Sequence, residues 1–127
     1  MEKSDVKLTV SAEDYLETAL LLTLQGKRIT VTGVAESLNV SKPAVTNALN
    51  ELAAKGLLVK QPYGDISLTP EGELAAKSVY DKHKLLHSFL LKLGVSEEIA
   101  QIDCCKIEHV LSDETFVCIK KFLANNN

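Results

Sequence analysis

Residues 30–69, TVTGVAESLNVSKPAVTNALNELAAKGLLVKQPYGDISLT, decide the fold of this chain. Thr30 is placed to cap a short helix over residues 31–38, and a tight turn follows it. Ser41 then caps a second helix over residues 42–55, which is followed directly by a glycine. Two helices joined by so short a turn predict a helix-turn-helix unit.

A β-hairpin is predicted immediately after the second helix. The β-rich runs Leu57–Lys60 and Ile66–Thr69 flank a cluster of turn-forming residues, Pro62-Tyr63-Gly64-Asp65. Helix, turn, helix and hairpin is the order of a winged helix-turn-helix domain.

Helices are predicted on both sides of this unit. The first covers about Ala12–Leu24, with Ser11 as its cap and Asp14 as the reciprocal partner of that cap. A long helix begins after Thr69-Pro70 and runs to about Leu93. Two further helices are expected over residues 97–111 and 113–124, capped by Ser96 and Ser112.

The fold class is therefore mainly α with a small β-hairpin wing, a winged helix-turn-helix followed by a helical half. We expect a DNA-binding domain over residues 1–70 and a second domain over residues 71–127.

Composition excludes several classes of protein. The 127 residues are 46% hydrophobic and carry a net charge of −3, which is typical of a globular domain. No apolar run approaches the roughly 20 residues of a membrane span, and the N-terminus has no apolar signal segment. Three cysteines make no disulfide framework. We expect a cytoplasmic protein with no membrane partner.

Positive charge gathers in the middle of the chain. Residues 27–70 hold five lysines or arginines against three acids, whereas residues 1–26 and 71–127 each have an excess of acids. If the protein binds DNA, it binds through this middle segment.

The second helix has the residues for reading DNA. Its apolar positions, such as Val45 and Leu49, form one stripe, which leaves small and polar side chains on the other face. Asn47 suits adenine, Ala44 or Pro43 suits a thymine methyl, and Ser41, Lys42, Thr46 and Lys60 suit phosphates. The expected contacts to double-stranded DNA are Ser41, Lys42, Pro43, Ala44, Thr46, Asn47, Lys60 and Tyr63. Thr46 has a solvated surface position as its alternative, and such units also occur as protein-binding modules.

Three expected helices each carry metal-binding residues on one face. Cys105, Glu108 and His109 have the spacing i, i+3, i+4. A thiolate, a carboxylate and an imidazole together suit Fe, Co, Ni or Zn. The two other sets are His83 with His87 at i, i+4 and Asp14 with Glu17 at i, i+3.

Each of the smaller sets has a structural alternative. Asp14 is also the expected partner of a helix cap, and Glu17 and His87 are common types of surface residue. Cys104 and Cys118 are expected in the core, where free cysteines are often buried.

These features resemble the metal-dependent repressors of the diphtheria toxin repressor and manganese transport regulator family. The resemblance covers roughly residues 8–124. The stretches that carry it are Glu13–Glu17 (EDYLE), Ser41–Thr46 (SKPAVT), Leu68–Gly72 (LTPEG), Val79–His83 (VYDKH) and Asp103–Ser112 (DCCKIEHVLS).

The resemblance implies a homodimer that binds a palindromic operator, takes no small-molecule substrate and is not an enzyme. It also implies a dimer contact in the helical half and a metal bound between the two halves. Residues matching the primary regulatory site are Asp14, Cys105, Glu108 and His109. Glu17 and His83 match a neighbouring site that shares Glu108, and His83 and His87 match an ancillary site, where Gln101 replaces a histidine ligand.

The ligand set mixes two patterns of the family. Manganese-type members have a carboxylate in place of Cys105, and iron-type members have a methionine in place of Asp14. Because a thiolate disfavours Mn(II) relative to Fe(II), we expect Fe(II) as the favoured co-repressor, with Mn(II) as the alternative.

Three other functions compete with this interpretation. A winged-helix regulator that senses redox state or zinc through Cys104 and Cys105 is the main one. A small metalloenzyme is a second, but the chain has no Gly-rich phosphate loop and no nucleophile–base pair apart from the metal-binding residues. The third is a structural module whose His and Cys residues are core residues.

Overall fold

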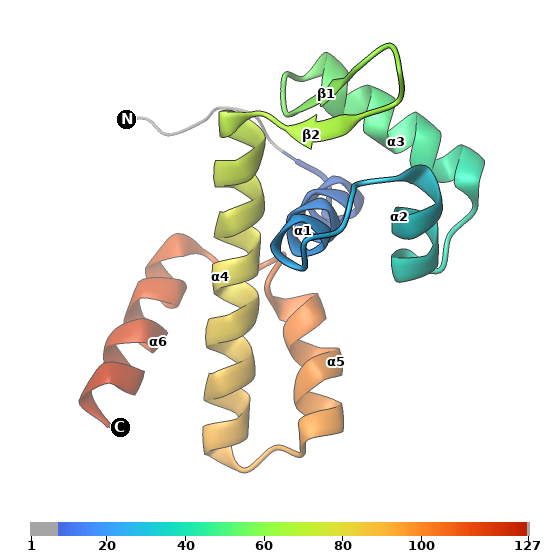
Figure 1. The fold of residues 1–127 in the computed structure, drawn as a ribbon. Helices are drawn as coiled ribbons and strands as arrows, with labels where there is room; N and C mark the ends of the chain where they lie inside the picture. Colours follow the sequence, from blue (N-terminus) through green and yellow to red (C-terminus); the bar gives the residue numbers. More distant parts are fainter. Residues whose placement is uncertain (1–7, 127) are drawn as a thin grey trace. The chain divides into compact units, whose positions relative to one another are not determined.

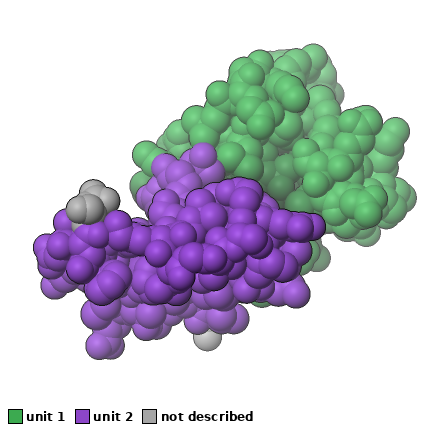
Figure 2. Space-filling model, turned by 90° about the horizontal axis from the view of Figure 1, so that it is seen from below, with its two compact units in different colours: residues 1–77 green, residues 78–127 purple. Residues whose placement is uncertain are grey.

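A computed structural model describes residues 8–126 of the chain (Figure 1). The elements, in order, are α1 (Val10–Leu24), α2 (Val31–Leu38), α3 (Lys42–Ala54), β1 (Leu58–Lys60), β2 (Ile66–Leu68), α4 (Pro70–Leu93), α5 (Glu97–Ile107) and α6 (Asp113–Asn125). The chain forms two compact units, residues 1–77 and 78–127, which Figure 2 distinguishes by colour. The predicted fold class is confirmed.

The first helix begins earlier than the sequence analysis predicted. Its N-cap is Thr9, whose hydroxyl accepts a hydrogen bond from the N–H of Ala12 (3.0 Å). The prediction that Ser11 caps this helix, with Asp14 as its partner, is wrong. Both Thr9 and Ser11 can cap a helix, and capping by Thr9 adds two residues to the helix.

Helices α2 and α3 form the predicted helix-turn-helix. Asn39 ends α2 in the left-handed conformation (φ 57°), which asparagine tolerates better than most residues. The N-caps Thr30 and Ser41 are those predicted. The stripe of α3 is buried at Val45, Leu49 and Leu52, so its other face is left exposed.

The hairpin is antiparallel and ends against the start of α4. Leu58 pairs with Leu68, and Lys60 pairs with Ile66. The carbonyl oxygen of Leu57 accepts a hydrogen bond from the N–H of Thr69 (3.1 Å). A Cβ atom at Gly72 would lie 1.9 Å from this oxygen, so only glycine lets α4 pass so close to the hairpin.

The second unit contains the C-terminal part of α4 together with α5 and α6. Leu86, Ala100 and Cys104 are buried in it. Phe89 and Phe122 pack edge to face, with ring centroids 6.2 Å apart. Helix α6 has no buried residue, and Cys118 on it is exposed, so the prediction of a core Cys118 is wrong.

Helix α5 ends four residues before its predicted end. Its last residue is Ile107, Glu108 is the C-cap, and His109 lies in the turn that follows. The N–H of Glu108 still donates to the carbonyl of Cys104 (3.0 Å), but the N–H of Val110 donates to the carbonyl three residues back. Glu108 therefore ends the helix as its C-cap, and the tighter turn places His109 beyond the helix to which the spacing assigned it.

None of the helices in residues 8–126 is both long and apolar enough to cross a membrane.

Candidate metal centre and nucleic-acid interface

The N-terminal turn of α3 is an exposed polar surface. The hydroxyl of Ser41 accepts a hydrogen bond from the N–H of Ala44 (3.2 Å). Ser41 and the next three residues are exposed, as is Asn47, whereas Thr46 is half-buried. These side chains are therefore available to a ligand, and their contacts to DNA stay a prediction.

The hairpin presents further polar groups in the same unit. The ammonium group of Lys60 donates to the side-chain oxygen of Asn50 on α3 (2.8 Å). Tyr63 at the tip is 76% exposed. Arg28 forms a salt bridge with Asp65, which joins the segment before α2 to the tip. Arg28 and Asn50 were not among the predicted site residues, and these contacts show that they help to position the wing.

Glu108 is the most unusual polar residue of the second unit, because its carboxylate is almost completely buried (side chain 1% exposed). One carboxylate oxygen lies 2.7 Å from Nδ1 of His83, and the other lies 3.4 Å from Nε2 of His109. The side chain of His109 is also buried (3% exposed). Burying a carboxylate is costly without a cation or hydrogen-bond donors, and the two imidazoles are cations only when protonated.

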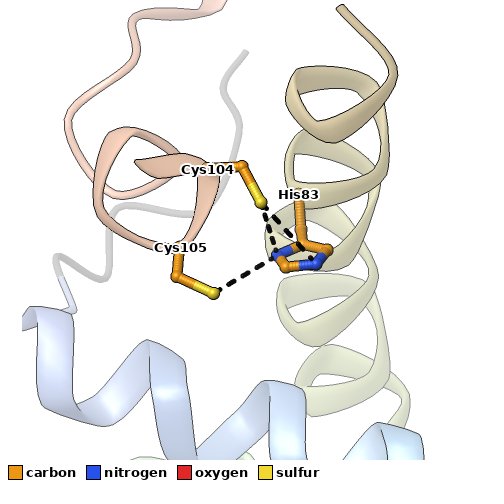
Figure 3. A group of neighbouring side chains, drawn as sticks. All are labelled: His83, Cys104 and Cys105. Atoms are coloured by element: carbon orange, nitrogen blue, oxygen red, sulfur yellow. Dashed lines mark hydrogen bonds between the residues drawn. The ribbon is translucent and has the colours of Figure 1, made fainter. Parts of the chain in front are cut away.

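Two thiols also lie near the imidazole of His83 (Figure 3). The Sγ atom of Cys104 is 3.6 Å from Nδ1 of His83, and the Sγ atom of Cys105 is 3.9 Å from the same nitrogen. Cys104 is fully buried, as predicted, and Cys105 is exposed. The sequence analysis placed Cys104 in the core and, with Cys105, in the alternative of a redox or zinc sensor, but not among the ligands of the regulatory site.

The residues of the expected ancillary site have other contacts. Nε2 of His87 lies 2.9 Å from a carboxylate oxygen of Glu97. The ring of His87 is parallel to that of His83, with centroids 6.4 Å apart. The side-chain amide of Gln101 donates to Sγ of Cys105 (3.5 Å). Gln101 therefore contacts a predicted metal ligand, and the ancillary site stays a prediction.

Asp14 and Glu17 belong to the first unit, on α1. Asp14 is half-buried and Glu17 is buried, so the alternative of a solvated Glu17 is wrong. Their part in a metal site stays a prediction.

The donor set of the second unit fits a divalent transition metal. It offers a carboxylate, imidazoles and thiols, a mixture that suits borderline ions. Bonds of about 2.1 Å place neighbouring ligands of one ion roughly 3.0–3.4 Å apart. The distances from Glu108 to His83 and to His109, 2.7 and 3.4 Å, lie close to that range.

Two family models match consecutive parts of the chain. The N-terminal DNA-binding domain of iron-dependent repressors matches residues 7–66. The metal-binding and dimerisation domain of the same repressors matches residues 69–127.

Known proteins match over most of this chain. An HTH-type transcriptional regulator of Methanocaldococcus jannaschii is 40% identical over 118 residues, which are 91% of this chain and 94% of that protein. The transcriptional regulator MntR of Salmonella typhimurium is 38% identical over 103 residues, 81% of this chain and 66% of that one. The solved manganese regulator SloR superimposes with a TM-score of 0.81 at 30% identity, covering 92% of this chain. The chain spans only 55% of SloR.

Proposed function

Because the chain belongs to the family of iron-dependent repressors, we propose that it is a metal-dependent DNA-binding transcriptional repressor in metal-ion homeostasis. The family consists of DNA-binding regulators and not of enzymes. We assign DNA binding to residues 1–70 and metal binding with homodimer formation to residues 71–127. The protein would act in the cytoplasm, on a palindromic operator.

The DNA-binding surface would be the exposed N-terminal turn of α3 together with the hairpin. The hairpin would supply Lys60 at the end of β1 and Tyr63 at the tip. Lys60 is already held by Asn50 of α3, so its charge lies beside the recognition helix before DNA arrives. The proposed contacts on α3 are Ser41, Lys42, Pro43, Ala44, Thr46 and Asn47.

The buried carboxylate of Glu108 is the observation that carries the metal-binding function. A carboxylate so completely enclosed and flanked by two imidazoles is stabilised most simply by a bound cation. Such an ion would supply positive charge that neutralises Glu108 and orients both imidazoles. The proposed ligands are Asp14, Glu17, His83, His87, Cys105, Glu108 and His109. The inclusion of Asp14 and Glu17 is supported by the resemblance of the EDYLE segment to the family.

The proposed co-repressor is Fe(II) or Mn(II), with Fe(II) favoured. The preference rests on Cys105, because thiolates bind Mn(II) poorly and suit Fe(II) better. The similarity to regulators named for manganese supports Mn(II) as the second ion.

Metal control would follow from a population shift. A bound ion would stabilise the conformation in which all of the proposed ligands can reach it. If only that conformation spaces the two recognition helices of a homodimer to match the operator, metal and DNA bind cooperatively.

The decisive experiment is DNA binding under anaerobic conditions, with the DNA upstream of the protein's own transcription unit. We expect binding with Fe(II) or Mn(II) and none with a chelator. Replacing Glu108 with Gln should lower metal-activated DNA binding by about 100-fold or more, given that even an outer partner of a metal ligand contributes 10- to 100-fold. The matched control is Glu98→Gln, an exposed acid on α5, which should bind DNA normally.

Two outcomes would contradict the proposal. Equal DNA binding with chelator and with metal would show that metal does not control DNA binding. Normal metal activation of DNA binding by the folded Glu108→Gln variant would show that Glu108 is not a ligand of the regulatory ion. Binding that instead responds to oxidant would favour the redox regulator acting through Cys104 and Cys105.

A further inference from the structure

We propose that Cys104, with His83 and Cys105, forms a second, thiolate-rich site for a zinc-class divalent ion. The site lies wholly within the second unit: His83 comes from α4, and both cysteines come from α5 (Figure 3). One ligand atom from each of the three residues lies within 4.8 Å of the others.

The interatomic distances match those of a metal site. With metal–sulfur bonds of about 2.3 Å and metal–nitrogen bonds of about 2.0–2.1 Å, sulfur and nitrogen ligands of one ion lie roughly 3.5–3.8 Å apart. The two sulfur atoms lie 3.6 and 3.9 Å from Nδ1 of His83. An ion could therefore bind these three atoms with little movement of α4 or α5.

A fourth donor is at hand. The carboxylate of Glu108 lies 2.7 Å from the same nitrogen of His83. When Nδ1 binds an ion it no longer donates to Glu108, since the ring proton then resides on Nε2. The carboxylate is then free of that hydrogen bond and completes a set of two sulfurs, one nitrogen and one oxygen. Four such ligands suit zinc or cadmium.

Metal binding fits the two cysteines better than a disulfide does. Bridged cysteines have Cα atoms about 4.4–6.8 Å apart, whereas neighbouring residues are held at about 3.8 Å. Cys104 and Cys105 are also both inside the helix α5, whose backbone would have to distort. Cys104 in the present structure donates to the carbonyl of Gln101 (3.5 Å), a contact that its thiolate would give up.

The site would act as a competitor of the regulatory ion, a consequence that rests on the proposed function. His83, Cys105 and Glu108 belong to both ligand sets. An ion held by two thiolates therefore removes three ligands from the regulatory site. Cys104 is the one ligand of the second set that is absent from the regulatory set.

The test uses Cd(II) as the probe and measures the thiolate-to-cadmium charge-transfer band of the full chain under anaerobic conditions. The background variant is Cys118→Ser, which removes the exposed cysteine of α6 and should leave the band unchanged. In this background, Cys104→Ser and Cys105→Ser should each lower the band by about half, because one of two thiolates is lost. Cys104→Ser should also weaken Cd(II) binding by at least about tenfold.

Either of two results would overturn the proposal. A full band in the Cys104→Ser variant would show that Cys104 is no ligand. No band in the Cys105→Ser variant at saturating Cd(II) would show the same. The second result is decisive even if the Cys104→Ser variant fails to fold, since Cys105 is exposed and its replacement spares the core. The band does not depend on DNA, so the failure of metal-activated DNA binding would leave this test intact.

Discussion

Helices α3 and α5 both begin at a serine that caps the first turn. Ser41 accepts the N–H of Ala44, and Ser96 accepts the N–H of Ile99. Their candidate functional residues, however, lie at opposite ends. In α3 they occupy the first turns and all but the half-buried Thr46 are exposed, whereas in α5 they occupy the last turn and the residues after it, where Glu108 is buried.

The difference follows the charge of the ligand that each end would bind. The N-terminus of a helix carries a partial positive charge, which favours DNA phosphates at α3. The C-terminus carries a partial negative charge, which favours a cation near Cys105 and Glu108. Polar side chains at α3 remain hydrated until DNA binds, but the carboxylate of Glu108 has already lost its water. The environment of the functional candidates is therefore more restrictive at the end of α5, where Glu108 is buried, than at the start of α3.

The largest effect expected at the exposed end is that of Asn47→Ala. Loss of a bidentate contact to adenine should weaken operator binding by roughly 1–3 kcal/mol, about 5- to 150-fold. Non-specific DNA binding and metal affinity should stay unchanged. The measurement is a titration of labelled operator and of scrambled DNA at one salt concentration, with Asn125→Ala on α6 as the control.

Equal losses of Asn47→Ala on operator and on scrambled DNA would place Asn47 against the backbone and not against a base. A change in the metal affinity of Asn47→Ala would show that a residue of α3 also affects metal binding at the end of α5.

A smaller effect is expected from Cys105→Glu in the last turn of α5. Replacing the thiolate with a carboxylate should shift the preference from Fe(II) toward Mn(II) by on the order of tenfold. The measurement is the ratio of the Fe(II) and Mn(II) concentrations that give half-maximal DNA binding. Cys118→Glu, at an exposed position on α6, is the control and should leave this ratio unchanged. An unchanged ratio in Cys105→Glu would mean that the thiolate does not set metal preference.

The α3 end was predictable because its signals are local. Ser41 as cap, the apolar stripe through Val45 and Leu49, and the turn before them are short-range patterns, and the structure has all of them. The hairpin strands were predicted to within a residue at each end for the same reason. The prediction of the α1 cap failed because two residues that can each cap a helix, Thr9 and Ser11, lie two positions apart.

The α5 end was less predictable because tertiary packing decides it. No glycine or proline marks the end of α5, and Glu108 still has helical backbone angles (φ −57°, ψ −26°). The spacing of Cys105, Glu108 and His109 predicted a set of metal ligands, which stays a prediction, and it did not locate the end of the helix. The closeness of Cys104 to His83 arises from the packing of α5 on α4, which sequence spacing does not express.

The smallest effect is expected from the paired cap variants Ser41→Ala and Ser96→Ala. Each removes one hydrogen bond to an N–H at a helix start, so each should lower the free energy of unfolding by about 1 kcal/mol. Urea unfolding followed by circular dichroism checks this. Only Ser41→Ala should also weaken operator binding, since of the two serines only Ser41 is assigned a phosphate contact. If Ser96→Ala weakens operator binding equally, the loss comes through stability, and Ser41 has no contact with DNA of its own.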